Sequence, residues 1–164
     1  MLVPTVRGFA LLSTGLLAGA FGYGAVNLVH GFRTVPLDVR LTFHTALMAV
    51  NGPVVQTVMA LAILSSGALA VLTRGLPRLL AASAGALAVA SFLVTRFGNV
   101  PINARIKVWA VGTVPPDHAE ILARWELFNN LRTGAAFVAF CLIVLVAVAG
   151  DRLAGPRADG PSGA

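Results

Sequence analysis

The chain has 164 residues, of which 57% are hydrophobic and only 11% are charged. A typical soluble protein has about 25% charged residues, so this composition excludes an ordinary soluble domain and indicates an integral membrane protein. The net charge of +6 comes from cations at the ends of apolar runs, without a basic cluster interleaved with aromatic residues, which excludes a nucleic-acid interface.

Four apolar runs are long enough to cross a bilayer, whose hydrocarbon core of about 30 Å takes roughly 20 helical residues. They cover approximately residues 8–28, 50–73, 79–97 and 130–150. The sequence therefore predicts an all-α, multi-pass membrane protein with one domain, a four-helix bundle of up-down-up-down topology. Residues 151–164 are rich in Gly, Pro, Asp, Arg and Ser, which predicts a disordered tail.

The first run contains a GxxxG step at Gly15 and Gly19, which lets helix backbones approach closely in lipid. We expect this face to pack within the bundle or against a second copy of the chain. Arg7 before the apolar run also fits a cleaved signal peptide, which stays open as an alternative. The short, arginine-bearing connection at 74–78 predicts that both termini are cytoplasmic.

The stretch from His30 to Val50 mixes polar and apolar residues and contains Pro36, which predicts an amphipathic connection that lies at the interface or folds partly back into the bundle. The second membrane helix is then expected to begin near Gly52, with Pro53 in its first turn. In an up-down-up-down bundle, the two long connections lie on the same side of the membrane. We therefore expect the 30–50 connection and the polar stretch 96–132 to meet over one end of the bundle.

The polar stretch 96–132 carries much of the chain's polarity, including both tryptophans. Asn99 precedes Pro101 and is typical of a helix N-cap, although it could equally belong to a site. Asn103 needs a hydrogen-bond partner in such an apolar chain, which predicts that it faces the bundle interior or a cavity. Asp117 and Glu120 follow a Pro-Pro pair and are typical of the first turn of a helix.

One predicted helix face carries polar residues toward the fourth span. Its members recur at positions i, i+4, i+7 and i+11, and they are Trp125, Asn129, Arg132 and Ala136. An aromatic ring, an amide and a guanidinium on one face predict an inward-facing site rather than three separate lipid contacts. Glu126 is expected to neutralise one of three cations, Arg124, Lys107 or Arg132.

Common catalytic and metal motifs such as CxxC, HExxH and GxxxxGK are missing from the sequence. The three histidines, His30, His44 and His118, lie in the two polar connections, so a haem or copper site built from them is geometrically allowed. Their spacing matches no ligand signature. We therefore predict a site without a metal, and keep a haem- or copper-binding redox protein as an alternative.

Three sequence elements follow one another through the last two thirds of the chain. They are Phe97-Gly-Asn99-Val-Pro101-Ile-Asn103, the step Pro116-Asp117, and Arg124-Trp125 followed by Asn129 and Arg132-Thr133. In this order they resemble a family of small four-span membrane proteins that includes the anthrone oxygenases of polyketide pathways. The resemblance implies oxidation of an anthrone to an anthraquinone by molecular oxygen, without an organic cofactor or a tightly held metal.

The resemblance carries over to individual positions, which are Asn99, Pro101, Asn103, Trp125, Asn129 and Arg132. The family often has a histidine where this chain has Asn130, so no base is implied at that position. We expect Arg132 to stabilise a substrate anion and Asn103 and Asn129 to bond substrate oxygens.

The expected site also needs a base and residues that contact the substrate. His44 or Glu126 is the expected base, and Trp125, Asn99 and Trp109 are the expected substrate contacts. The function indicated is a membrane oxygenase for an apolar phenolic or anthrone-like molecule that enters from the lipid bilayer. A non-enzymatic accessory or small-molecule-binding bundle, whose polar stretch only caps the helices, stays open beside the redox alternative.

Overall fold

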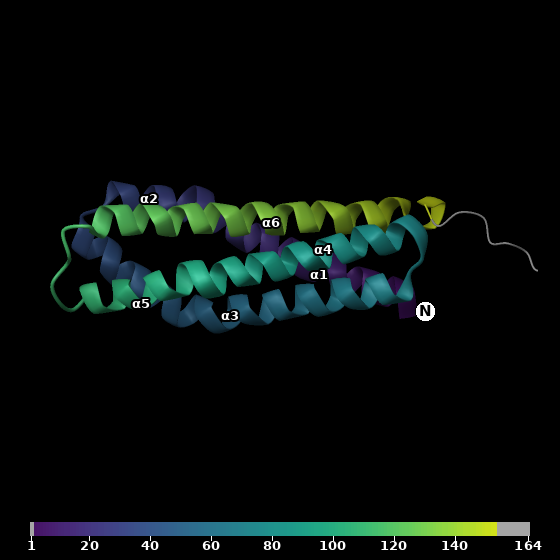
Figure 1. Cartoon of the computed structure of the whole chain (residues 1–164), viewed down its shortest axis with the longest axis horizontal. Coiled ribbons are helices and arrows are strands. Elements are labelled where there is room, and N and C mark those ends of the chain that lie inside the picture. The colour runs from purple at the N-terminus through teal and green to yellow at the C-terminus, as the bar shows by residue number, and fades with distance from the viewer. Residues whose placement is uncertain (1, 154–164) are drawn as a thin grey trace, which may run out of the picture.

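The computed structural model describes residues 2–153, and within this range every regular element is a helix. Four long helices lie side by side (Figure 1). The first long helix comprises α1 (Leu2–Tyr23), η1 (Gly24–Leu28) and α2 (Val29–Thr34), and the second is α3 (Leu37–Leu72). The third comprises α4 (Gly75–Val94), η2 (Thr95–Asn99) and α5 (Val100–Trp109), and the fourth is α6 (His118–Leu153). Each is long and apolar enough to cross a membrane. The predicted all-α class and its four membrane helices are confirmed.

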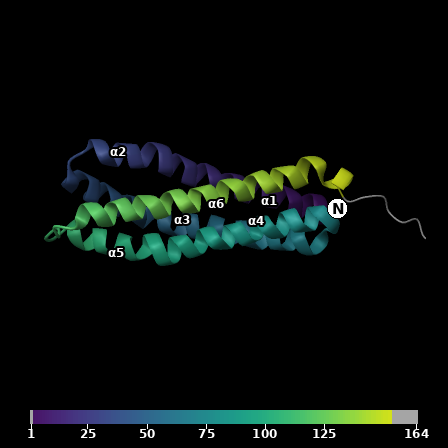
Figure 2. The ribbon, with the colours of Figure 1, turned by 45° about the horizontal axis from the view of Figure 1, so that its top comes forward.

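Successive long helices run in opposite directions. The N-terminus and the α3–α4 connection lie at one end of the bundle, whereas α2, α5 and the starts of α3 and α6 lie at the other (Figures 1 and 2). We call this second end the polar end, because the stretch 96–132 extends into it. The tail predicted for 151–164 is helical as far as Leu153, and the rest of it lies outside the described residues.

The predicted interfacial connection over 30–50 is wrong, because the chain leaves the helical conformation only at Val35 and Pro36. Pro36 occupies the N-cap of α3, where its missing N–H removes no helical hydrogen bond. The second helix therefore begins at Leu37 rather than near Gly52, and Pro53 lies inside it. Thr57 Oγ1 donates to the carbonyl of Pro53 at 3.0 Å, an adjustment of the kind that makes proline tolerable in membrane helices.

Two π turns interrupt the first and third long helices. The backbone N–H of Val29 bonds to the carbonyl of Gly24, and that of Val100 bonds to the carbonyl of Thr95. The helix therefore continues through Asn99, whose side chain makes no cap hydrogen bond. The predicted N-cap role of Asn99 is wrong, because its amide donates instead to the carbonyl of Trp125 on α6 at 3.1 Å.

The α3–α4 connection is as tight as its sequence predicts. Gly75 has φ +62°, a conformation that side chains disfavour. Arg78 Nε donates to the carbonyl of Thr73 at 2.9 Å and to that of Ala70 at 3.2 Å. This arginine thereby satisfies carbonyls that the end of α3 would leave without partners.

The long helices are longer than a bilayer requires. A helix of 36 residues, such as α3 or α6, extends about 54 Å, against a hydrocarbon core of about 30 Å. No charged residue lies between Arg78 and Arg96 in the third long helix, or between Arg132 and Asp151 in the fourth. These limits define an apolar slab, beyond which the polar end projects with its own core around Trp109 and Trp125.

Of the two glycines in the GxxxG step of α1, Gly15 faces the inside of the bundle and Gly19 faces its outside. A Cβ at Gly15 would lie 3.1 Å from the ring of Phe140 on α6, so Gly15 permits close packing inside the bundle. A Cβ at Gly19 would meet nothing within 4 Å. Association of two copies through this face stays a prediction.

Gly98 in η2 allows the third long helix to pack closely against Phe128 of the fourth. A Cβ there would lie 2.6–2.9 Å from three ring carbons of Phe128. We expect Gly98→Ala to lower the free energy of unfolding by about 1–3 kcal/mol, because the ring must shift in a packed interface. Denaturant titration followed by circular dichroism measures this, with Gly134→Ala on α6, where a Cβ meets nothing within 4 Å, as the matched control. Equal effects of the two changes would contradict the packing explanation.

Candidate functional site

A pocket of about 200 Å³ lies where the apolar slab meets the polar end. All four long helices contribute to its wall, through Ala20, Phe21, Gly24, Leu28, Met48, Asn51, Gly52, Val54, Val55, Gln56, Thr95, Val100, Asn103, Trp125, Asn129 and Arg132. Four residues predicted for the site, Asn103, Trp125, Asn129 and Arg132, are therefore brought together here. Val54 and Gln56 are exposed, so the pocket opens toward the outside of the bundle.

The inward orientation predicted for the stripe on α6 is confirmed. Trp125 and Asn129 are each 2% exposed, and Ala136 is 1% exposed. The 3.6-residue repeat of the helix brings these positions to the side that faces the other three long helices. Their chemical role stays a prediction.

Arg132 presents a guanidinium to the pocket without a carboxylate partner among the described residues. Its Nη2 and Nε donate to Asn129 Oδ1 at 2.8 and 3.2 Å, and its Nη1 lies 3.5 Å from Thr95 Oγ1. The guanidinium carbon lies 4.3 Å from the centre of the Phe21 ring, a cation–π contact. The positive charge is thus held in place, and no acid within residues 2–153 neutralises it.

Asn129 has its amide oriented by the same arginine. Because Oδ1 accepts from Arg132, the Nδ2 group points elsewhere, and it is buried without a hydrogen-bond partner. A buried donor without a partner costs about 1–3 kcal/mol, so the arrangement favours a ligand that brings an acceptor. Arg132 and Asn129 together can bind an oxygen atom with partial or full negative charge.

Asn103 is oriented by two aromatic partners. Its Oδ1 accepts from the indole Nε1 of Trp125 at 2.7 Å, and since an indole N–H only donates, the amide orientation is determined. His44 Nε2 lies 3.1 Å from the same oxygen, which requires the Nε2–H tautomer of the imidazole. The Nδ2 group therefore lies on the other side, 3.3 Å from Met48 Sδ, which also lines the pocket.

His44 lies behind the pocket wall rather than in it. Its ring stacks on Phe32 at 5.1 Å between centres and meets Trp125 edge-on at 4.6 Å. His44 is not among the lining residues, and its Nδ1 is buried without a partner. The imidazole thus reaches the pocket only through Asn103 and Trp125.

Glu126 has partners that the sequence did not indicate. Arg33 of α2 donates to Oε2 through both Nη2 and Nε, and Arg40 of α3 donates to Oε1 at 3.1 Å. The predicted pairing with Arg124, Lys107 or Arg132 is wrong, and Arg124 bonds instead to Glu120 at 2.9 Å. Glu126 therefore joins the corner between α2 and α3 to α6, and it does not line the pocket.

Two residues expected to contact the substrate lie elsewhere. Asn99 is fully buried between α6 and the third long helix, and Trp109 packs in the core of the polar end. The pocket instead includes residues that we did not propose for the site, among them Phe21, Met48, Asn51, Gln56 and Thr95. Asn51 and Gln56 could have been recognised as site candidates from the sequence, since an amide within an apolar run is costly in lipid unless it has a function. Phe21 and Met48 carry no such signal.

The three histidines do not gather into a metal site. Residues 2–153 contain no group of three or more His, Cys, Asp or Glu side chains positioned to hold a metal ion. His30 is exposed, His44 is buried beside Trp125, and the Nδ1 of His118 lies 2.8 Å from the carbonyl of Pro115. The haem or copper alternative therefore gains no support from the placement of these side chains.

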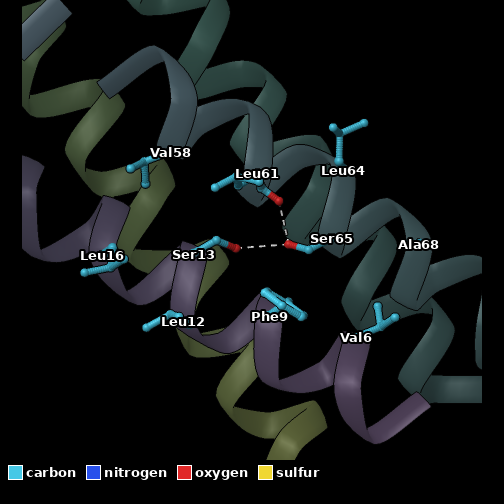
Figure 3. A pocket seen from close by; sticks show the side chains of 10 residues that line it. All are labelled: Val6, Phe9, Leu12, Ser13, Leu16, Val58, Leu61, Leu64, Ser65 and Ala68. Carbon is cyan, nitrogen blue, oxygen red and sulfur yellow. Dashed lines mark hydrogen bonds between the residues drawn. The ribbon is translucent and has the colours of Figure 1, made fainter. Parts of the chain in front are cut away.

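A second hollow of about 370 Å³ lies between α1 and α3, closer to the N-terminal end (Figure 3). Its wall is apolar except for Ser13 and Ser65, whose hydroxyls lie 3.0 Å apart. Ser65 Oγ also lies 2.6 Å from the carbonyl of Leu61. Because both hydroxyls already bond to protein atoms, this hollow offers few hydrogen-bonding groups that could orient a polar substrate.

Comparison with known proteins identifies a family for this chain. The family model described as anthrone oxygenase matches residues 39–142, which is more than half of the chain. The matched range contains Asn103, Trp125, Asn129 and Arg132. Among curated proteins and solved structures, no match was found. From the extent of the family match, the chain belongs to the anthrone oxygenase family.

Proposed function

We propose that this protein is a membrane oxygenase that oxidises an apolar phenolic or anthrone-like substrate with molecular oxygen in the pocket around Arg132. One observation carries the proposal: a guanidinium without a carboxylate partner, among the described residues, bonds to the Oδ1 of Asn129, whose Nδ2 is buried without a partner. Both groups line a largely apolar pocket that opens toward the outside of the bundle. A substrate dissolved in the bilayer could enter there with its oxygen leading.

The chemistry begins with loss of a proton from the substrate's CH₂ carbon, which leaves an enolate. Molecular oxygen forms a bond to this carbon, takes up the electron pair and, with one proton, becomes a hydroperoxide. Cleavage of the O–O bond and loss of the second C–H proton release water and leave a carbonyl. One anthrone and one O₂ thus give one anthraquinone and one water.

The residues of the pocket favour the first of these steps. Arg132 and Asn129 donate hydrogen bonds toward the oxygen on which the enolate charge develops, and a dry site strengthens these interactions. Asn103 offers a further N–H donor, oriented by Trp125 and His44. Trp125 supplies an aromatic wall for the ring system.

The proton acceptor in this scheme is a water molecule that enters from the polar end of the bundle. Among the described residues, the pocket lining contains no carboxylate, imidazole or thiol, and Glu126 is occupied by two arginines. His44 is thus a positioning residue, because its Nε2–H orients Asn103 from behind.

A direct assay tests the proposal. Purified full-length protein in lipid nanodiscs, supplied with anthrone, is expected to consume oxygen and form anthraquinone in a 1:1 ratio. With ¹⁸O₂, one labelled atom should appear in the new carbonyl. Nanodiscs without protein control for spontaneous oxidation. A rate equal to that of empty nanodiscs, with folded protein, would refute the proposed function for this substrate class.

His44→Gln separates a positioning histidine from a base. Glutamine retains an N–H donor for Asn103, so we expect kcat/KM to fall by no more than about tenfold, the value of one hydrogen bond of 0.5–1.5 kcal/mol. The pH dependence of the rate should keep its shape, and His118→Gln, at the first residue of α6 and outside the pocket lining, serves as the control. A loss of more than a hundredfold together with a changed pH profile would instead identify His44 as the base.

A further inference from the structure

Gly24 of the first long helix and Gly52 of the second both line the pocket. Neither has positive φ, and a Cβ built on either would meet nothing within 4 Å. Glycine inside a helix costs about 1 kcal/mol relative to alanine. Neither the backbone conformation nor a close neighbour requires glycine at these two positions, so their effect is to keep the pocket wide.

Open space alone does not distinguish these glycines, since Gly67 and Gly134 also have no neighbour within 4 Å. Those two do not line the pocket. What distinguishes Gly24 and Gly52 is that they line the same pocket as Arg132 and Asn129, whose Nδ2 is buried without a hydrogen-bond partner. The pocket therefore combines two small residues with one unpaired donor, the Nδ2 of Asn129.

The proposed substrate is flat. Carbon atoms in contact lie about 3.5–4.0 Å apart, so an aromatic ring needs little thickness but an unobstructed plane. A leucine side chain projecting from either glycine would occupy that plane. Alanine would intrude by a single methyl group.

We propose that Gly24 and Gly52 form a slot that selects the substrate by the size of its fused-ring system, admitting a flat three-ring molecule whose oxygen reaches Arg132 and Asn129. The inference builds on the proposed function, because the ring and its oxygen are those of the proposed substrate. It nevertheless concerns binding, which does not require turnover.

Binding of anthraquinone, which cannot be oxidised further at the same carbons, tests the slot without catalysis. All variants carry Trp109→Phe, so Trp125 in the pocket wall is the only tryptophan and its fluorescence reports occupancy. Full-length protein in nanodiscs is titrated with anthraquinone and with the smaller naphthoquinone. The variants are Gly24→Leu, Gly52→Leu, their milder alanine counterparts, and Gly67→Leu as a matched control on α3 outside the pocket.

We expect Gly24→Leu and Gly52→Leu to weaken anthraquinone binding at least tenfold and naphthoquinone binding no more than threefold. The alanine variants should weaken anthraquinone binding by a smaller factor and remain folded even if a leucine variant does not. Gly67→Leu should bind both quinones as the parent does. Unchanged anthraquinone binding in folded leucine variants, an equal loss for both quinones, or no binding by the parent protein would overturn the slot.

The oxygen assay distinguishes a failed slot from a failed function. If the binding pattern holds but the protein does not oxidise anthrone, the slot is supported and the oxygenase is refuted. If anthrone is oxidised but Gly24→Leu and Gly52→Leu turn it over at the parent's rate, the oxygenase is supported and the slot is refuted.

Discussion

Replacing Arg132 by leucine is expected to lower kcat/KM for anthrone oxidation by about 10²–10³-fold, with the protein still folded. This is the loss typical of removing one preorganised donor to a developing oxyanion. Arg132 is the only cationic residue in the described pocket lining, and no described acid neutralises it. Its removal therefore takes away the main electrostatic stabilisation of the enolate.

The loss should extend to conservative changes at the same position. Lysine retains the charge but cannot donate to Asn129 Oδ1 with two nitrogens of a planar group, so Arg132→Lys should regain only part of the activity. Oxygen uptake measures the rates, and circular dichroism with size-exclusion chromatography monitors folding.

Arg124→Leu is the matched control for Arg132→Leu. Arg124 lies on the same helix, is exposed and bonds only to Glu120 among the described residues. The same substitution there should leave kcat/KM within about twofold, because an exposed i,i+4 pair contributes only about 0.3–0.5 kcal/mol. Full activity of a folded Arg132→Leu protein would remove Arg132 from the reaction and with it the proposed arrangement of the site.

Replacing Glu126 by alanine is expected to have the largest effect on stability, lowering the free energy of unfolding by about 3 kcal/mol. Its carboxylate bonds to two arginines, of which Arg33 is largely exposed and Arg40 is buried. Loss of the acid leaves Arg40 buried without a counter-ion, beside the ring of Phe32 at 5.5 Å. The penalty comes mainly from that uncompensated buried charge.

Denaturant titration in detergent measures this loss, and Glu120→Ala is its control. The Glu120–Arg124 pair is exposed, so Glu120→Ala should change stability by less than about 0.5 kcal/mol. The double variant Glu126→Leu, Arg40→Met should recover most of the stability, because an apolar pair replaces a buried ion pair at little cost. If Glu126→Ala were as stable as the parent but inactive, Glu126 would be a catalytic group rather than a link between helices.

Hydropathy was sufficient to predict the class of this protein and its four membrane helices. A bilayer core excludes charged residues, so a membrane helix must be a long apolar run. Such runs can be recognised without knowing the tertiary structure. The helical repeat of Trp125, Asn129 and Arg132 likewise predicted one inward face, because position around a helix follows from sequence spacing. Proline was a poorer guide in the second long helix, where Pro36 marks the start of α3 but Pro53 lies inside it.

The tertiary structure decided what those inward residues meet. Glu126 bonds to arginines 86 and 93 positions away, and no periodicity relates them to it. The tautomer of His44 and the orientation of Asn103 depend on Trp125, a donor from another helix. Local spacing determines which face of a helix a residue occupies, whereas its partner depends on how the helices pack. For this protein, that packing leaves Arg132 unneutralised at an open pocket and pairs Glu126 away from it.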